Sequence, residues 1–334
     1  MSRIAILGGG SWGTALSIVL ARARRKHDLS LWVHDPALAE HMACDRENQT
    51  YLPELQLARD VQVTADIREA VAGAQILIGA LPTAHAREVY SAAAKYTPHE
   101  TIFVSASKGL EPNTHKRMSE VIETVLARTV ASRVAVLSGP SFAAEAARGE
   151  PTAVVLASPD DSLASELQQE FAAPNFRLYT NDDVVGVELA GAIKNVIAIA
   201  AGVCQGLGLG SNPLAALITR GLAEMSRLAA ALGAQPETLT GLAGLGDLVL
   251  TCTGSLSRNR HVGMELGKGR ALREILEGMR MVAEGVGTAA ALLALDRDAR
   301  IELPITAEVD AILHRGKVPR EAIQDIMSRP QKRE

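Results

Sequence analysis

The sequence predicts an α/β domain over residues 1–182, followed by an all-helical domain over residues 183–334. Two observations support this division. Short apolar runs alternate with helical patterns in the first half, and long helical stretches rich in Ala and Leu follow from about Asp183. Strands that alternate with helices are typical of a mostly parallel sheet with helices on both faces. The helical half is interrupted by glycine-rich stretches at 206–210, 241–246 and 267–269.

The first strand, helix and second strand enclose a glycine motif. An apolar run at 3–7 is followed at once by Gly8-Gly9-Gly10-Ser11-Trp12-Gly13, which fits G-x-G-x-x-G. A helical pattern begins at Ser11, and a second apolar run at 29–33 ends at His34 and Asp35. Glycines in this setting allow a tight turn and close approach of a pyrophosphate to the helix N-terminus. The N-terminal domain is therefore predicted to be a Rossmann-like doubly wound sheet that binds a dinucleotide.

Four further buried strands are predicted at 74–82, 101–105, 134–138 and 152–157. In such a sheet, ligands bind outside the carboxyl ends of the strands. Polar or turn-forming residues follow several of these ends, and they should converge on one edge; they are His34, Pro82, Lys108 and Ser141. We expect the two domains to pack closely, with the site between them.

Lys194 lies in an apolar helical stretch at 188–202. An ammonium group removed from water without a partner is very costly, so packing alone rarely explains one in a core. A stripe of small side chains lies at helical spacing from it and would let a ligand or another backbone approach; it comprises Ala190, Gly191, Ala198 and Ala201. The functional interpretation is a charged group directed into a pocket. The alternative is a structural lysine that reaches solvent or pairs with an acid.

Three polar segments interrupt the helical half. Asp247 lies between glycines and an apolar run, where it is either a helix N-cap or a partner for Lys194. Residues 257–260 combine hydroxyl, guanidinium and amide donors, which suit a phosphate, although a solvated turn has the same composition. Glu284 precedes a glycine break, and taken alone it is typical of a surface residue.

Composition excludes several classes of protein. A net charge of −4 gives no indication of binding to nucleic acid or to an anionic membrane. Cys44, Cys204 and Cys252 are far apart and lack metal-site spacing, so we expect reduced thiols in a cytoplasmic protein, no metal and a core position for Cys252. The N-terminus leads directly into a strand, which argues against a signal peptide. Lys194 interrupts the longest apolar stretch, so no integral membrane segment is predicted.

On these motifs the chain resembles the bacterial NAD(P)-dependent glycerol-3-phosphate dehydrogenase family. The resemblance covers nearly the whole chain and rests on the glycine motif with Trp12 and on residues 31–36, 107–110, 138–143, 191–196, 217–221, 244–252 and 257–260. It implies reversible reduction of dihydroxyacetone phosphate to sn-glycerol 3-phosphate, which supplies phospholipid synthesis. It also implies that Lys194 is the catalytic acid/base.

The resemblance further implies the binding residues. The substrate would contact Lys108, Gly139, Ser141, Lys194, Asp247, Ser257, Arg258 and Asn259. The cofactor would contact Gly8, Gly10, Ser11, Trp12, Gly13, His34, Lys108, Ala143, Arg258, Val282 and Glu284. We expect NADPH to be preferred and NADH to be possible, with His34 near the 2′-phosphate. The resemblance also implies a homodimer.

Two other functions compete with this one. A β-hydroxyacid dehydrogenase of the 6-phosphogluconate type also joins a dinucleotide domain to a helical domain with a catalytic lysine near an asparagine. The serine, arginine and asparagine at 257–259 and the Gly139-Pro140-Ser141 turn favour glycerol phosphate instead. A non-catalytic dinucleotide sensor would need neither a buried lysine nor a phosphate-binding segment.

Overall fold

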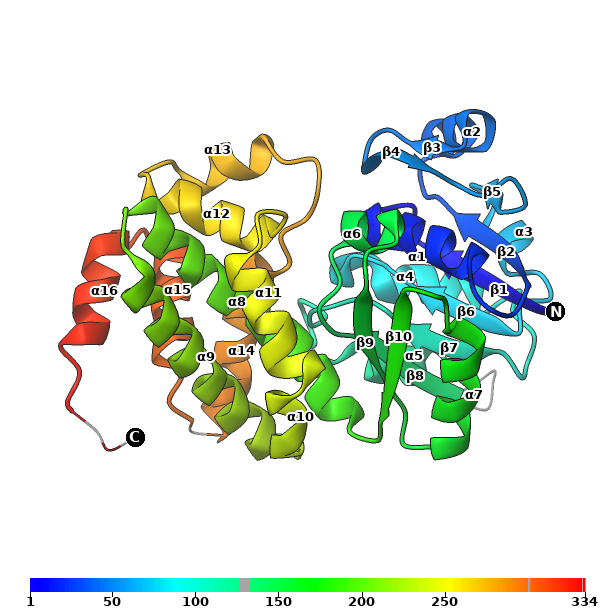
Figure 1. Ribbon diagram of the computed structural model, residues 1–334. Coiled ribbons are helices and arrows are strands. Elements are labelled where there is room, and N and C mark those ends of the chain that lie inside the picture. The colour runs from blue at the N-terminus through cyan, green and yellow to red at the C-terminus, as the bar shows by residue number, and fades with distance from the viewer. Residues whose placement is uncertain (127–132, 300, 332, 334) are drawn as a thin grey trace. The chain divides into compact units, whose positions relative to one another are not determined.

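The structure, a computed structural model, describes residues 1–126, 133–299, 301–331 and 333, with residues 296–299 described by their backbone alone (Figure 1). The chain forms two compact units. The first unit comprises Met1–Glu111 and Lys116–Glu188, and the second comprises Pro112–His115 and Leu189–Glu334. The predicted division of the folding domains after residue 182 stays a prediction.

An eight-stranded sheet forms the centre of the first unit. Its strands are β1 (Ser2–Leu7), β2 (His27–Trp32), β5 (Gln62–Thr64), β6 (Ile76–Gly79), β7 (Ile102–Ser105), β8 (Arg133–Ser138), β9 (Thr152–Ala157) and β10 (Phe176–Asn181). Their spatial order is β10-β9-β8-β7-β6-β1-β2-β5, and neighbouring strands of this sheet pair in parallel except β8 with β9. The chain therefore winds outward from β1 in one direction and then from β6 in the other, which confirms the predicted doubly wound sheet.

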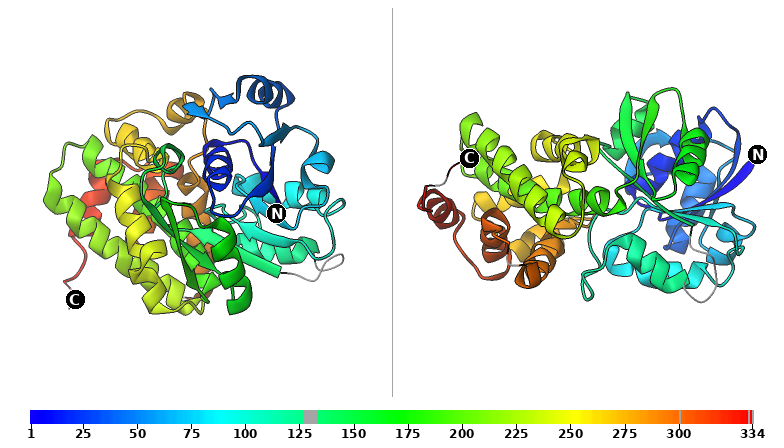
Figure 2. Two further views of the ribbon diagram at one scale, coloured as in Figure 1. Left: turned by 45° about the vertical axis from the view of Figure 1, so that its right-hand side comes forward. Right: turned by 90° about the horizontal axis from the view of Figure 1, so that it is seen from below.

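Helices cover both faces of this sheet, as the views in Figures 1 and 2 show. They are α1 (Ser11–Ala21), α2 (Pro36–Asp45), α3 (Ile67–Val71), α4 (Thr83–Ala93), α5 (Met118–Leu126), α6 (Ala143–Arg148) and α7 (Asp161–Phe171). Successive strand residues point to opposite faces, so Ile4 and Ile6 join the core beneath α1, α6 and α7, while Ala5 and Leu7 join the core beneath α3, α4 and α5. A hairpin of β3 (Glu47–Asn48) and β4 (Leu52–Gln56) follows α2.

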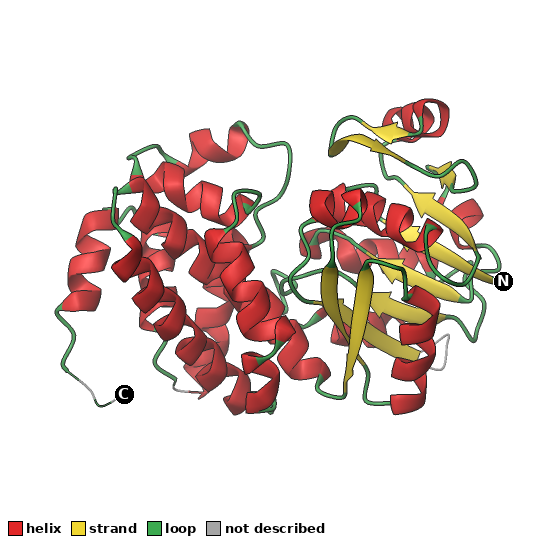
Figure 3. Ribbon diagram, viewed as in Figure 1, coloured by secondary structure: helices red, strands yellow, loops and turns green. Residues whose placement is uncertain are grey.

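The second unit is helical in the part of it that the structure describes, and the strands, yellow in Figure 3, belong to the first unit. Its elements are α8 (Val184–Gly206), α9 (Ser211–Ala231), α10 (Pro236–Thr240), the π-helical turn η1 (Leu242–Gly246), α11 (Asp247–Thr253), α12 (Arg258–Gly267), α13 (Leu272–Glu277), α14 (Gly285–Ala299), α15 (Pro304–His314) and α16 (Pro319–Met327). The predicted helical domain is confirmed. The stretch at 241–246 differs from the expected break, because it continues as η1 into α11.

Helix α8 carries Lys194, and its first turn is fixed within the first unit. Asp183 accepts a hydrogen bond of 2.8 Å from the Gly186 amide. The buried Glu188 carboxylate accepts bonds from the Ser119 amide (2.9 Å) and from Arg117 Nη1 (3.1 Å). Burial raises the pKa of Glu188, while the contacts with Ser119 and Arg117 lower it. Since both partners lie at the start of α5, this carboxylate ties α8 to the helix layer of the sheet.

By length and composition α8 alone, among the described helices, could cross a membrane. However, 89% of its most apolar window is buried inside the folded chain, which is typical of the core helix of a globular protein.

Glu224, in α9, is a buried carboxylate whose titration should make the stability of the second unit depend on pH. Its carboxylate is 1% exposed and accepts the Ile305 amide (2.6 Å) and the Thr306 amide (3.3 Å) at the start of α15. Burial raises the pKa of Glu224 from 4.5 to about 7, although these hydrogen bonds oppose the shift. The folded chain therefore holds a proton that the unfolded chain releases near pH 4.5. The free energy of unfolding should fall as pH rises from about 4.5 to 7, by an amount on the order of 3 kcal/mol.

Glu224→Gln should flatten this dependence, because the amide oxygen still caps α15 without titrating. Urea unfolding of both proteins between pH 4.5 and 8 measures the difference, with the exposed Glu237→Gln as a control. Equal pH slopes in wild type and Glu224→Gln would show that Glu224 does not titrate in this range.

Candidate active site

The glycine turn after β1 combines glycines that the fold requires with one that faces open space. A Cβ at Gly8, whose φ is +122°, would lie 2.4 Å from the Ala80 carbonyl oxygen. A Cβ at Gly13 would lie 1.9 Å from the Gly8 carbonyl oxygen. At Gly10, by contrast, a Cβ would meet no atom of the described chain within 4 Å. Packing within the described chain therefore does not require glycine at this position.

Residues around the turn fit the pyrophosphate of a dinucleotide. Ser11 begins α1 directly after Gly10, and the N-terminus of a helix attracts phosphate. The Nε1 of Trp12 is buried without a hydrogen-bond partner among the described residues. An open glycine, a helix N-terminus and a donor without a hydrogen-bond partner among the described residues thus lie together at this turn.

His34 and Asp35 follow β2 and differ in what their side chains do. The His34 ring is exposed and lies edge-on to Trp32, with 5.7 Å between the ring centroids. The Asp35 carboxylate instead caps α2, accepting the amides of Ala37 (2.9 Å) and Leu38 (3.4 Å). His34 is thus available to a ligand, whereas Asp35 has a structural role in α2.

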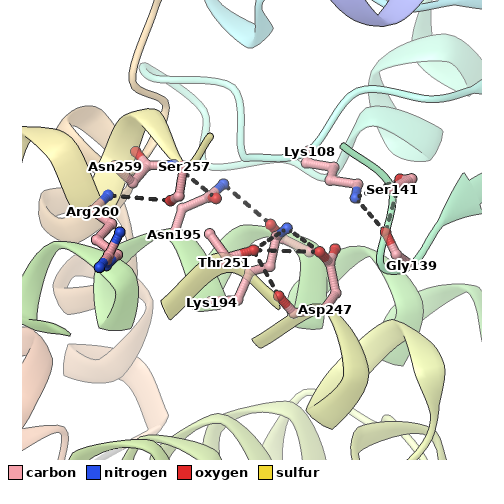
Figure 4. A network of polar contacts seen from close by, with 11 residues as sticks. Lys108, Gly139, Ser141, Lys194, Asn195, Asp247, Thr251, Ser257, Asn259 and Arg260 are labelled. Carbon is pink, nitrogen blue, oxygen red and sulfur yellow. Dashed lines mark hydrogen bonds and ion pairs between the residues drawn. The ribbon is translucent and has the colours of Figure 1, made fainter. Parts of the chain in front are cut away.

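Lys108, Gly139 and Ser141 are predicted substrate residues, and the structure brings them together in the first unit (Figure 4). Lys108 Nζ donates to the Gly139 carbonyl (2.8 Å) and to Ser141 Oγ (3.4 Å). Ser141 Oγ donates to the same carbonyl at 2.9 Å. Gly139 has a φ of +124°, and a Cβ there would lie 3.1 Å from the Val154 Cα. The loops after β7 and β8 are thereby joined through a cation.

The buried ammonium of Lys194 has a carboxylate partner in Asp247. Lys194 Nζ donates to Asp247 Oδ1 at 2.5 Å and to Thr251 Oγ1 at 2.9 Å (Figure 4). The side chains of Lys194 and Asp247 are 6% and 1% exposed. The Thr251 hydroxyl donates to the Asp247 carbonyl at 2.6 Å, which leaves its oxygen to accept from the lysine. Of the two alternatives for Asp247, the partner is confirmed and the N-cap is wrong, since Gly246 occupies the cap position of α11.

The glycine-rich turn η1 positions this carboxylate. The Gly246 amide bonds to the Gly241 carbonyl at 3.1 Å, which closes a π-helical turn. A Cβ at Gly244 would lie 2.0 Å from the Leu239 carbonyl oxygen, so the close packing of η1 on α10 requires glycine. Asp247 therefore follows η1 directly, as the first residue of α11. Thr251 lies one turn later on the same face.

Residues 257–259 combine one exposed side chain, that of Arg258, with two buried ones, those of Ser257 and Asn259. Ser257 caps α12 by accepting the Arg260 amide at 3.2 Å, and Arg258 is exposed at the helix N-terminus. Neighbouring parts of the chain partly desolvate the Arg258 guanidinium, which lowers its pKa, and the Glu284 carboxylate raises it. The guanidinium stays charged at neutral pH. Asn259 is buried; it donates to Asn195 Oδ1 (2.9 Å) and accepts the Gly285 amide (2.9 Å). It joins α8, α12 and α14.

The remaining predicted cofactor residues lie at or just before the starts of α6 and α14. Ala143 begins α6, Val282 is exposed, and Glu284 is half-buried immediately before α14. Cys252 is a core residue, as expected, and burial raises the pKa of its thiol to about 12 despite Lys194 and Arg260 nearby. No group of three potential metal ligands occurs among the described residues.

Sequence reasoning did not single out some members of these networks. Thr251 could have been found from its spacing, because it lies four residues after Asp247 in a helical pattern. Asn195 was noted only as part of a motif, and it donates to the Gly191 carbonyl as well as accepting from Asn259. Ser107, whose hydroxyl donates to the Leu81 carbonyl at 2.7 Å, joins the ends of β6 and β7 without a sequence signal of its own.

Helix α12 crosses α8 at a distance that only glycine permits. A Cβ at Gly202 would lie 2.0 Å from the Arg260 carbonyl oxygen, and one at Gly263 would lie 1.9 Å from the Ile199 carbonyl oxygen. The sequence predicted a close approach along a stripe that includes Ala198 and Ala201. The approach occurs beside that stripe, on the face that carries Gly202. It brings the start of α12 to the helix that holds Lys194.

Comparison with known proteins identifies the family. The N-terminal sequence pattern of NAD-dependent glycerol-3-phosphate dehydrogenase matches residues 3–164, and the C-terminal pattern matches residues 183–324. The chain belongs to this family. Among its relatives, the glycerol-3-phosphate dehydrogenase [NAD(P)+] of Koribacter versatilis is 52% identical over 331 residues, which cover 99% of this chain and 98% of the relative. That of Acidobacterium capsulatum is 54% identical over 336 residues, covering 99% of each.

A solved structure has the same fold over nearly its full length. The glycerol-3-phosphate dehydrogenase of Coxiella burnetii gives a TM-score of 0.93 at 40% identity, covering 98% of this chain and 99% of that one. Membership in the glycerol-3-phosphate dehydrogenase family selects the first of the three functions over the β-hydroxyacid dehydrogenase and the sensor.

The crossing of α8 and α12 can be tested with one added methyl group. Gly263→Ala should lower the free energy of unfolding by about 1–3 kcal/mol, because backbone must move to admit the Cβ. Gly287→Ala is the matched control: it also lies in a helix, but a Cβ there meets no described atom within 4 Å, so stability should stay equal or rise. Urea unfolding measures both. Equal stability of the two variants would contradict the close crossing.

Proposed function

We propose that this chain catalyses the NAD(P)-dependent reduction of dihydroxyacetone phosphate to sn-glycerol 3-phosphate, which supplies phospholipid synthesis. The observation that carries the proposal, in a chain of this family, is the buried pair of Lys194 and Asp247. Replacing a buried ion pair with apolar residues is often neutral or stabilising, so stability alone is a weak reason for its presence. Buried, paired groups of this kind cluster at functional sites.

Lys194 has the chemistry that reduction of a ketone requires. When bound, the reduced nicotinamide supplies a hydride to the carbonyl carbon, and negative charge then develops on the carbonyl oxygen. The ammonium stabilises that charge and donates a proton to the oxygen, and in the reverse direction the amine takes the proton back. Asp247 and Thr251 accept hydrogen bonds from Nζ and hold it in one position, so little reorganisation is needed during reaction.

The substrate phosphate requires cations and hydrogen-bond donors, and the predicted substrate residues include both. In the second unit, Arg258 and Ser257 lie at the N-terminus of α12, where helix dipole, guanidinium and hydroxyl all favour a phosphate. In the first unit, Lys108 provides a cation beside Ser141. Asn259 fixes the start of α12 by hydrogen bonding to Asn195 and to the Gly285 amide. Binding energy from the phosphate would then orient the carbonyl for reaction.

We propose that NADPH is preferred over NADH. A carboxylate at the end of the second strand usually selects NAD by binding the ribose hydroxyls. Here the Asp35 carboxylate caps α2, while the exposed His34 imidazole can donate to a 2′-phosphate. A cytoplasmic location, inferred from the cysteines, and a homodimer, implied by the family resemblance, stay predictions.

The reaction is tested by loss of nicotinamide absorbance when the protein is mixed with dihydroxyacetone phosphate and NADPH, and again with NADH. Rapid oxidation that depends on the triose phosphate is expected. Oxidation of NADPH or NADH with a β-keto acid, but not with dihydroxyacetone phosphate, would support the competing β-hydroxyacid dehydrogenase.

Loss of the Lys194 ammonium should lower turnover by about 10²- to 10⁴-fold, the scale of a lost general acid. Because a lone substitution leaves Asp247 buried and unpaired, the double variant Lys194→Met/Asp247→Asn is used to remove both charges while keeping the volume. It should fold and bind NADPH while showing this loss in kcat. A folded double variant with turnover near that of wild type would exclude Lys194 from the mechanism.

His34→Ala should reduce the preference for NADPH over NADH, expressed as the ratio of kcat/KM values, by about tenfold. This is roughly the effect of one charge-assisted hydrogen bond of about 1.5 kcal/mol. Asp35→Asn is the matched control, since asparagine also caps helices and should leave the ratio unchanged. A large loss of NADH activity in Asp35→Asn would instead assign the ribose contact to Asp35.

A further inference from the structure

Asn48, in the hairpin that follows α2, is fully buried and forms hydrogen bonds in three directions. Its Nδ2 donates to the Gly9 carbonyl at 2.8 Å and to Thr14 Oγ1 at 2.8 Å. Its Oδ1 accepts the Tyr51 amide at 3.1 Å. Two acceptors on one side and a donor on the other fix the orientation of the amide. A residue 39 positions from Gly9 thus contacts the backbone of the glycine turn.

The contact with the Gly9 carbonyl sets the direction of the next amide. The peptide unit between Gly9 and Gly10 is planar and trans, so its C=O and N–H point in opposite directions. Asn48 holds the oxygen toward the interior, and the Gly10 amide therefore points away from Asn48. Gly10 is the N-cap residue of α1, and a Cβ there would meet no described atom within 4 Å. The turn is thus open at Gly10, the residue whose amide Asn48 orients.

The second contact ties the same asparagine to the first turn of α1. The Thr14 amide bonds to the Gly10 carbonyl at 3.0 Å, which begins the helix. Asn48 therefore bridges the residue before the helix N-terminus and the first full turn after it. Loss of its two donors would leave the Gly9 carbonyl buried without this partner and free the turn to rotate.

We propose that Asn48 is a positioning residue for the cofactor pyrophosphate, acting through the peptide between Gly9 and Gly10. The inference rests on the proposed dinucleotide cofactor and adds a residue outside the G-x-G-x-x-G motif to its binding site. Because both NADPH and NADH carry the pyrophosphate, Asn48 contributes to affinity for both. It differs in this from His34, which discriminates between them.

Binding without substrate tests the proposal. The chain's two tryptophans, Trp12 and Trp32, lie beside the glycine turn and at the end of β2, so their fluorescence reports nucleotide binding. Asn48→Asp keeps the shape and the acceptor but removes both donors. We expect its Kd for NADPH, NADH and ADP to rise by about tenfold or more. The Kd for adenosine 2′-monophosphate, which has no pyrophosphate, should stay within about twofold of wild type.

Two controls separate positioning from loss of structure. Glu47→Gln alters the adjacent hairpin residue, whose carboxylate accepts the Glu54 amide at 2.8 Å, and it should leave all four Kd values unchanged. Asn48→Ala, which introduces no charge, should reproduce the selective loss and serves if the aspartate variant does not fold.

An equal loss of affinity for adenosine 2′-monophosphate and ADP, or unchanged affinity for ADP, would overturn the role of Asn48. Wild-type protein that binds ADP and NADPH but reduces no triose phosphate would overturn the proposed function while leaving this inference in place. Wild-type protein that binds none of the nucleotides would overturn both.

Discussion

An ammonium buried in an apolar helix requires an opposite charge, and this requirement organises the second unit. Lys194 meets Asp247 only because η1 and α11 bring a carboxylate to the middle of α8. Thr251 follows on the same face of α11 and completes the set of acceptors. Since leaving either charge unpaired costs several kcal/mol, the placement of α11 against α8 is closely constrained. The arrangement that we propose for proton transfer is thereby held by the fold itself.

Close approach of backbones is the second constraint, and glycines permit it in both units. In the first unit Gly8 and Gly13 let the β1 turn pack on itself and on the loop after β6. In the second unit Gly202 and Gly263 let α8 and α12 cross with their backbones nearly in contact. Both cases place the N-terminus of a helix, α1 or α12, beside residues proposed to bind phosphate. Gly10 differs from these four because the described chain leaves the space around it open.

The sequence was sufficient to predict the elements that have a strong local pattern. The β1 turn, the parallel strands and the apolar helix with Lys194 are all encoded by periodicity and by residues adjacent in the chain. Contacts between residues far apart in the sequence could not be predicted in this way. From the sequence, Asp247 is equally well interpreted as a helix N-cap or as a partner of Lys194, because a π-helical turn has no distinct sequence pattern. The Asn259 amide could donate a hydrogen bond to a phosphate, yet it is buried. It contacts Asn195 and Gly285, so the packing of α8, α12 and α14 determines its orientation.

The first unit and the second share helix α8, and this affects how the protein can be divided. Glu188 is held by Arg117 and Ser119 in the first unit, while Lys194, six residues later in the same unbroken helix, belongs to the second. The boundary between the units falls within α8, so a division after Glu188 would sever an apolar helix, whereas one before Val184 would leave it whole. Exchange of modules between relatives would succeed only where the junction leaves α8 whole. Helix α8 thus limits where the chain can be cut or recombined.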